Sequence, residues 1–183
     1  PSSPPLPRYA IAMYYTQMTK NTLGQIVTNQ FELDPEQLYS IEGSYVFQEN
    51  TWVYQFFHHI VDRVDANLNF TVHHYYNKNS FEWVAFLAFR WTEFPWNDYL
   101  RTNLCVGEGI SRISRVTRRE RLNSDDVQKF INYLSFEAAF ALPSHPFFEV
   151  FARMHHRSGV FGLYGAKNCG STAIGAGIRW LFP

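Results

Sequence analysis

The sequence predicts an all-β fold, an eight-stranded antiparallel transmembrane β-barrel of the outer-membrane type. Three observations predict it. Apolar and polar residues alternate with a period of two over eight segments, each about as long as the 9–11 residues that a strand needs to cross a bilayer. Aromatic residues make up 18% of the chain and gather near the segment ends, as in the girdles of membrane barrels. Charged residues make up only 17%, and within the segments they share the polar face.

Composition and charge exclude several other classes of protein. The 16 basic and 16 acidic residues give a net charge of zero, which removes the case for a nucleic-acid partner. No run reaches the ~18 apolar residues of a membrane-spanning helix. Cys105 on the polar face and Cys169 in the last loop predict neither a disulfide nor a metal site, and no motif predicts a cofactor. The proline-rich residues 1–7 predict an extended arm before one barrel domain, residues 8–182.

The alternation is clearest in the last segment, where Ile174, Ile178 and Trp180 share one face and Arg179 lies on the other. A period of two over this length indicates a strand. The predicted strands are Tyr9–Gln17, Tyr39–Phe47, Leu68–Tyr76, Phe81–Trp91, Leu100–Ile110, Phe130–Leu142, Phe147–Arg157 and Thr172–Phe182. With eight antiparallel strands, both chain termini are expected at the same, periplasmic end of the barrel.

Two architectures accept these strands. A soluble sandwich or barrel buries its apolar face, whereas an outer-membrane barrel turns that face to lipid and its charges to the lumen. Strand length and the aromatic ends favour the membrane barrel. The charges of the polar face also favour it, because they are balanced in sign and can pair inside a narrow lumen. They are Glu42, Glu82, Arg90, Arg101, Glu137, Glu149, Arg153 and Arg179.

The connections between strands differ in character. Lys20–Gln37 and Arg115–Gln128 are long and polar, as extracellular loops are. The arginines of the second loop can meet lipopolysaccharide phosphates, or the loop is simply solvated. In residues 51–64 the apolar side chains recur at helical spacing, which predicts an amphipathic helix at the membrane interface; an extended strand is the alternative.

Two adjacent histidine pairs, His58–His59 and His73–His74, have no supporting cysteine or carboxylate spacing for zinc. Neighbouring residues on a strand point to opposite faces, so neither pair can chelate one ion. We therefore expect these histidines at the barrel surface or in its aromatic girdles.

One pair of polar residues continues the lipid-facing register of the seventh strand. His156 and Ser158 follow Val150, Ala152 and Met154 on the same face, and residues two apart on a strand point the same way. A serine beside an imidazole is the minimum for nucleophilic acyl transfer, and here it would meet lipid esters. The alternative is that both residues only mark the exit of the strand into the headgroups.

Three segments give the chain a family resemblance: Leu100–Arg115, Leu134–Pro143 and, above all, the RMHHRSG of Arg153–Gly159. They resemble the outer-membrane lipid A 3-O-deacylases, the PagL-type or acyloxyacyl-hydrolase-like barrels, over roughly residues 81–182. The resemblance implies an eight-stranded barrel in the outer membrane of a Gram-negative bacterium. It also implies that His156 and Ser158 stand at the family's catalytic His-x-Ser.

The resemblance further implies two sites where this chain departs from the family. The family's acid on the last strand corresponds to Thr172, and no Asp or Glu follows Glu149. Glu108 shares the apolar register of its own strand and is a possible substitute, two strands away. The family's oxyanion-holding Asn after the serine corresponds to Gly159, whose backbone N–H can still donate.

Two functions follow from these residues. The first is an esterase-like acyl hydrolase acting on lipid A, with lipopolysaccharide as its partner. The second is a catalytically silent barrel of the same lineage, which serves as a structural subunit or binds a protein partner in the membrane. The outward His-x-Ser favours the first, and the missing acid favours the second.

Overall fold

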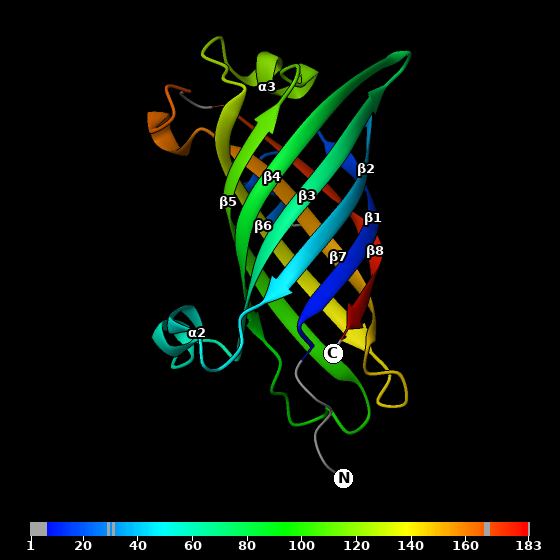
Figure 1. Ribbon diagram of the computed structural model, residues 1–183. Coiled ribbons are helices and arrows are strands. Elements are labelled where there is room, and N and C mark those ends of the chain that lie inside the picture. The colour runs from blue at the N-terminus through cyan, green and yellow to red at the C-terminus, as the bar shows by residue number, and fades with distance from the viewer. Residues whose placement is uncertain (1–6, 29, 31, 167–168, 183) are drawn as a thin grey trace.

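A computed structural model describes residues 7–28, 30, 32–166 and 169–182. Its strands form one closed antiparallel barrel in chain order, and β8 is hydrogen-bonded to β1 (Figure 1). The strands are β1 (Tyr9–Thr19), β2 (Leu33–Val46), β3 (Arg63–Tyr75), β4 (Lys78–Trp91), β5 (Arg101–Ile113), β6 (Phe130–Ala141), β7 (Phe148–Ser158) and β8 (Gly170–Phe182). The predicted fold class is confirmed.

β2 and β3 begin well before their predicted first residues, and for the same reason. β2 begins at Leu33, inside the predicted loop Lys20–Gln37, and β3 begins at Arg63 rather than at Leu68. The added residues carry charged side chains, among them Asp34, that are buried within the barrel. Charge near a strand end is typical of a solvated loop in a soluble protein, whereas here it lines the lumen.

The connections hold three short helices, α1 (Leu23–Val27), α2 (Trp52–Phe57) and α3 (Arg118–Asn123), and a 3₁₀ turn, η1 (Val160–Gly162). The start of β1, the end of β8 and α2 lie at one end of the barrel, called here the terminal end, and α3 and η1 lie at the other, the α3 end (Figure 1). None of the described helices has the length and hydrophobicity needed to cross a membrane.

The helix predicted over residues 51–64 is present but shorter. α2 is capped by Thr51, ends at Phe57, and is followed by a turn that leads into β3. Val53 of α2 packs with Val64, which already belongs to β3. The apolar residues at helical spacing in 51–64 therefore belong to three elements, a helix, a turn and the start of a strand. The placement of α2 at the membrane interface stays a prediction.

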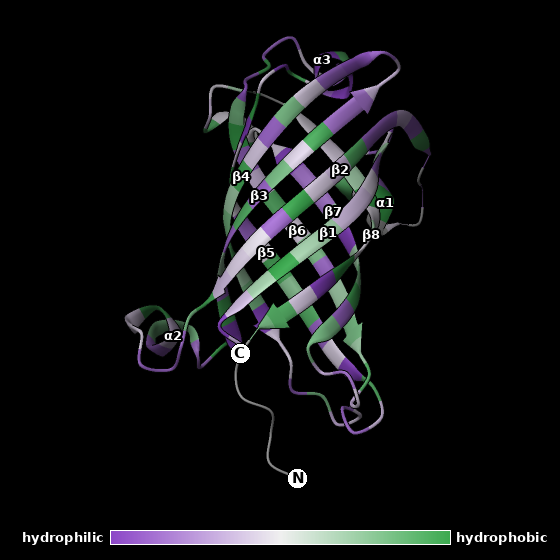
Figure 2. Ribbon diagram, turned by 45° about the vertical axis from the view of Figure 1, so that its right-hand side comes forward, coloured by the Kyte–Doolittle hydropathy of each residue, from purple (hydrophilic) through white to green (hydrophobic). Residues whose placement is uncertain are grey.

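The side chains of the wall are inverted relative to a soluble barrel. Leu68 and Trp83 are exposed in the outward register, while Glu82 and Arg90 are fully buried in the inward register of β4. Figure 2 shows the resulting alternation of hydrophobic and hydrophilic residues along the strands. A soluble barrel would bury its apolar face instead, so the soluble alternative is excluded.

The charges nearer the terminal end meet at Glu137. Its carboxylate oxygens lie 2.9 Å from Arg90 Nη1, 2.5 Å from Arg153 Nη2 and 2.8 Å from Arg179 Nη1. Arg179 also pairs with Glu149 at 2.7 Å. The direct pairing predicted for these lumen charges is confirmed, and each buried ion has an opposite charge beside it.

A second network surrounds Glu82, nearer the α3 end. Its carboxylate lies 2.7 Å from His73 Nε2, 3.1 Å from His155 Nε2 and 3.3 Å from Arg157 Nη1. His73 Nδ1 in turn lies 2.9 Å from Glu36. The expectation of a surface position for His73 is therefore wrong, because its side chain is held in the lumen by two carboxylates.

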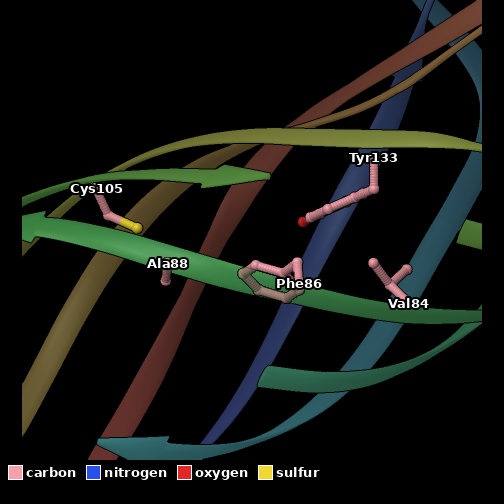
Figure 3. Close-up of a cluster of buried hydrophobic side chains, with 5 residues drawn as sticks. All are labelled: Val84, Phe86, Ala88, Cys105 and Tyr133. Atoms are coloured by element: carbon pink, nitrogen blue, oxygen red, sulfur yellow. The ribbon is translucent and has the colours of Figure 1, made fainter. Parts of the chain in front are cut away.

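On the side of the lumen formed by β4, β5 and β6, an apolar cluster lies between the two networks. Along the inward register of β4 it lies between Glu82 and Arg90. Figure 3 shows its five side chains, Val84, Phe86, Ala88, Cys105 and Tyr133. The rings of Phe86 and Tyr133 are 5.0 Å apart between centroids. The middle of the lumen is thus filled by ring and aliphatic contacts, with charge on either side of it.

The loop predicted over Arg115–Gln128 contains α3, and one of its acids enters the barrel. Thr117 caps the helix by accepting a hydrogen bond from the Glu120 N–H at 3.1 Å. The Glu120 residue is 0% exposed, and its Oε1 accepts from Arg157 Nε at 2.7 Å and from the Ser171 hydroxyl at 2.9 Å. α3 is therefore tied to the charged lumen through Glu120, while most of the loop around it is exposed, as expected of a solvated loop.

The inverted barrel predicts heat-modifiable migration. We expect an unheated sample to migrate differently from a boiled one in an SDS gel, because the closed barrel keeps its shape until it is heated. Circular dichroism in detergent should be dominated by strand. A protein that stays monomeric and soluble without detergent would contradict the inverted wall.

The lumen network predicts a large cost for losing one arginine. Arg153 binds Glu42 with Nη2 at 2.9 Å as well as Glu137, so Arg153→Met leaves both carboxylates short of a cation. We expect a loss of about 3–5 kcal/mol in the free energy of unfolding, measured by urea titration in detergent. The exposed Arg8 serves as control, since Arg8→Met should cost at most about 0.5 kcal/mol. Equal unfolding midpoints for the two variants would contradict the network.

Candidate functional site

Three neighbouring strands bring the predicted site residues together on the outer wall. His156 of β7 lies opposite Thr172 of β8. Ser158, two residues further along the same face of β7, lies opposite Gly170 of β8 and Asn132 of β6. Because the strands are paired on both sides, these positions are fixed by the hydrogen-bond ladders of the barrel rather than by a loop.

His156 contacts Thr172 directly. Nδ1 of the imidazole lies 2.8 Å from the Thr172 hydroxyl oxygen, and Thr172 is only 1% exposed. When Nδ1 is the protonated nitrogen and donates to Thr172, Nε2 keeps the lone pair that a general base needs. The contact therefore holds the ring of His156 on the outward face of β7, the same face on which Ser158 lies.

The hydroxyl of Ser158 is placed at the start of a turn. Its oxygen accepts a hydrogen bond from the Val160 N–H at 3.2 Å, which leaves its own hydrogen to be donated. Val160 has a φ of +44°, an unusual value for a β-branched residue. Within the described residues no hydrogen bond joins Ser158 to His156. On one face of a strand the two residues are about 7 Å apart at their Cα atoms, so a rotamer change decides their contact.

Gly159 is not a free oxyanion donor in this structure. Its N–H donates to the carbonyl of Cys169 at 2.9 Å. A Cβ atom at this position would lie 2.1 Å from the carbonyl oxygen of Ala166, so only glycine fits. The departure from the family pattern at Gly159 therefore has a packing reason: it lets the η1 loop close against the end of β7.

The two cysteines are both free and buried. Cys169 lies near the site through its carbonyl contact with Gly159. Burial raises the pKa of the Cys169 thiol to about 11, so the thiol is protonated at neutral pH. A protonated thiol is a weak nucleophile compared with a thiolate.

Asn132 belongs to the same wall and was missed from the sequence. It lies opposite Ser158, and its Nδ2 donates to Glu108 Oε1 at 2.8 Å. Its Oδ1 is buried without a partner among the described residues. Glu108, considered as a substitute acid, reaches Asn132 and not His156. The signal available in the sequence was a polar residue in the outward register between Phe130 and Leu134.

A shallow apolar hollow of about 870 Å³ continues along the wall toward the terminal end. Its lining includes Met154, two residues from His156 on β7, and Ile174, two residues from Thr172 on β8. It also includes the small side chain of Ala152. The hollow therefore borders the His156 part of the wall, although His156, Ser158 and Thr172 are not among its lining residues.

Comparison with known proteins gives structural likeness only. No family model and no curated protein matches the sequence. The outer-membrane enzyme PagL matches with a TM-score of 0.57 at 13% identity, over 94% of this chain and 99% of that one. Neisserial surface protein A, NspA, matches with a TM-score of 0.53 at 14% identity, over 95% and 96%. The N-terminal barrel of Pseudomonas aeruginosa OprF matches at 0.50 and 12%, over 96% and 98%.

These likenesses are of similar strength for proteins with different names and roles, so they assign the fold and not the activity. A closed barrel with an apolar outside and a charged lumen is the architecture of bacterial outer-membrane proteins. Together with the likeness of fold, the inverted wall places the chain in a bacterial outer membrane.

Proposed function

We propose that the protein is an outer-membrane ester hydrolase that removes acyl chains from lipid A, with Ser158 as nucleophile and His156 as general base. The observation that carries the proposal is the 2.8 Å contact between His156 Nδ1 and the Thr172 hydroxyl, in the outward register beside Ser158. Lipid acyl esters reach this wall, whereas soluble substrates do not. The shared fold with the outer-membrane enzyme PagL supports the same assignment.

The reaction follows the two steps of serine esterases. His156 Nε2 takes the proton of the Ser158 hydroxyl as its oxygen attacks the carbonyl carbon of the ester. The tetrahedral intermediate collapses, His156 returns the proton to the leaving oxygen of the headgroup, and the acyl group stays on Ser158. A water molecule, deprotonated by His156, then releases the fatty acid and restores the serine.

The neighbours of the dyad set its expected strength. Thr172 orients the imidazole of His156 but cannot neutralise the imidazolium as a carboxylate does, so we expect slow turnover. Asn132 has two N–H bonds on Nδ2, and the one that does not bind Glu108 can donate to an oxyanion formed at Ser158. It is the donor that we propose in place of the Gly159 N–H.

The second candidate function is a catalytically silent barrel that acts as a structural or partner-binding subunit. Two observations favour it: the described residues place no carboxylate on His156, and the Gly159 N–H is bonded to Cys169. Mass spectrometry of lipid A from cells with and without the protein separates the two functions. A mass loss equal to one acyl chain supports the hydrolase, and identical spectra support the silent barrel.

Removal of the Ser158 hydroxyl tests the proposed nucleophile. We expect Ser158→Ala to lower fatty-acid release from lipid A in detergent micelles by at least about 10³-fold, since the attacking oxygen is lost. Ser80→Ala, on β4 and away from the site, is the matched control and should keep the wild-type rate. Retention of the wild-type rate by Ser158→Ala would rule out this nucleophile.

Replacement of Thr172 by an acid tests whether the missing carboxylate limits the rate. We expect Thr172→Asp to raise the rate about tenfold or more, because a carboxylate on Nδ1 stabilises the imidazolium, an effect of about 10⁴-fold in the serine-protease triad. Aspartate is chosen over glutamate because Thr172 is buried and has little room. The neutral isostere Thr172→Asn is the control. If both variants have the same rate, the charge of the acid is not what limits this site.

A further inference from the structure

A second groove, of about 610 Å³, lies on the outer wall over β3, β4 and the end of β5 near α3. Three of its lining residues are aromatic and two are basic. They are Phe70, Phe81, Trp83, Arg112, Ile113, Ser114 and Lys129. No carboxylate lines the groove, so it combines an apolar surface with net positive charge.

The aromatic part of the groove is formed across β3 and β4. The rings of Phe70 and Trp83 are 4.6 Å apart between centroids, and those of Phe70 and Phe81 are stacked at 6.0 Å. Trp83 is 63% exposed and Phe81 46% exposed in the outward register. Rings in this position near one end of a membrane barrel lie at the boundary between hydrocarbon and headgroups.

The basic part lies at the α3 end of these rings. Arg112 is opposite Trp83 across β4 and β5 and opposite Phe130 across β5 and β6. The backbone carbonyl of Lys129 accepts a hydrogen bond from the Ile113 N–H at 2.9 Å. This bond holds Lys129 beside Arg112, although the two residues are distant in the sequence. Both side chains are exposed, and neither has an ion-pair partner among the described residues.

We propose that this groove binds a phosphate-bearing lipid of the outer leaflet, with its phosphate between Arg112 and Lys129 and an acyl chain on the aromatic rings. Two exposed cations above a hydrocarbon-facing surface attract an anion at headgroup level, and a lipid phosphate supplies it. A guanidinium and an ammonium together offer several charge-assisted donors to phosphate oxygens. An acylated phosphate is the ligand that matches both halves of the groove.

The groove stands close to the proposed hydrolytic site. Asn132 of β6 lies opposite both Ser158 of β7 and Ile110 of β5, and Arg112 is two residues beyond Ile110 on the same face. Strand spacings put Arg112 roughly 12 Å from Ser158 along the wall. A lipid held by its phosphate can thus present the ester of one of its other acyl chains to Ser158. This presentation rests on the proposed function, whereas the binding of the phosphate does not.

Quenching of Trp83 by brominated lipids tests the binding without any hydrolysis. The full chain is reconstituted in phosphatidylcholine vesicles that contain phosphatidic acid, with the bromine on one lipid or on the other. Trp83→Phe, measured in parallel, isolates the signal of Trp83. We expect phosphatidic acid to be preferred by about fivefold for each cation that contacts its phosphate.

Matched variants decide the outcome. The pair Arg112→Gln with Lys129→Gln should abolish the preference, Arg112→Lys should keep part of it, and Arg8→Gln at the terminal end should leave it unchanged. Heat-modifiable migration verifies that each variant is folded. Equal quenching by the two lipids in the wild type, or an unchanged preference in the double variant, would overturn the proposal. Loss of the preference on adding inorganic phosphate at micromolar concentration would also overturn it, since the site would then take a soluble anion.

The same variants separate this proposal from the hydrolase. If Arg112 and Lys129 bind the lipid but wild type and Ser158→Ala release fatty acid equally, the binding site stands and the proposed hydrolysis fails. In the opposite case hydrolysis depends on Ser158, and the double variant keeps both the wild-type rate and the lipid preference. The phosphate site is then contradicted, and the proposed hydrolysis is not.

Discussion

Glu137 receives arginines from three other strands inside the barrel, and the chemistry of the whole wall depends on this convergence. A buried charge without a partner costs several kcal/mol, so the lumen can hold these residues only as a closed set of pairs. The outward positions are apolar for a different reason, because they face lipid, where polar groups are costly. The apolar cluster around Phe86 lies between this network and the one around Glu82 on the β4–β6 side of the lumen, and each network contains both cations and anions.

A filled lumen leaves the outer wall as the surface on which this barrel can act. Polar residues there are exceptions to an apolar pattern, and the two proposed sites near the α3 end are built from such exceptions: His156 with Ser158 and Thr172, and Arg112 with Lys129. Most of these positions belong to strands paired on both sides. Sites on such strands hold their geometry more closely than sites on loops, which favours chemistry that needs fixed distances.

The period-two alternation was enough to predict the strands, the inverted wall and the outward register that brings His156 to Thr172. It failed where charge appears outside the alternation. Glu120 lies in a charged loop and its burial depends on Arg157, a residue distant in the sequence. The bond from the Gly159 N–H to Cys169 depends on how the η1 loop folds back, which no local pattern encodes. Register is a local property, whereas burial of a loop residue is set by tertiary contacts.

The contact of Arg153 with Glu42 has a consequence for the order of assembly. Arg153 is on β7 and Glu42 is on β2, on opposite sides of the seam where β8 meets β1. An open sheet still allows Arg153 to bind Glu137, its neighbour on β6, but leaves Glu42 unneutralised. Joining the first and last strands therefore completes the charge balance in the same event. Closure of the seam is therefore the step that neutralises Glu42, and a closure in the wrong register would leave this carboxylate without its cation.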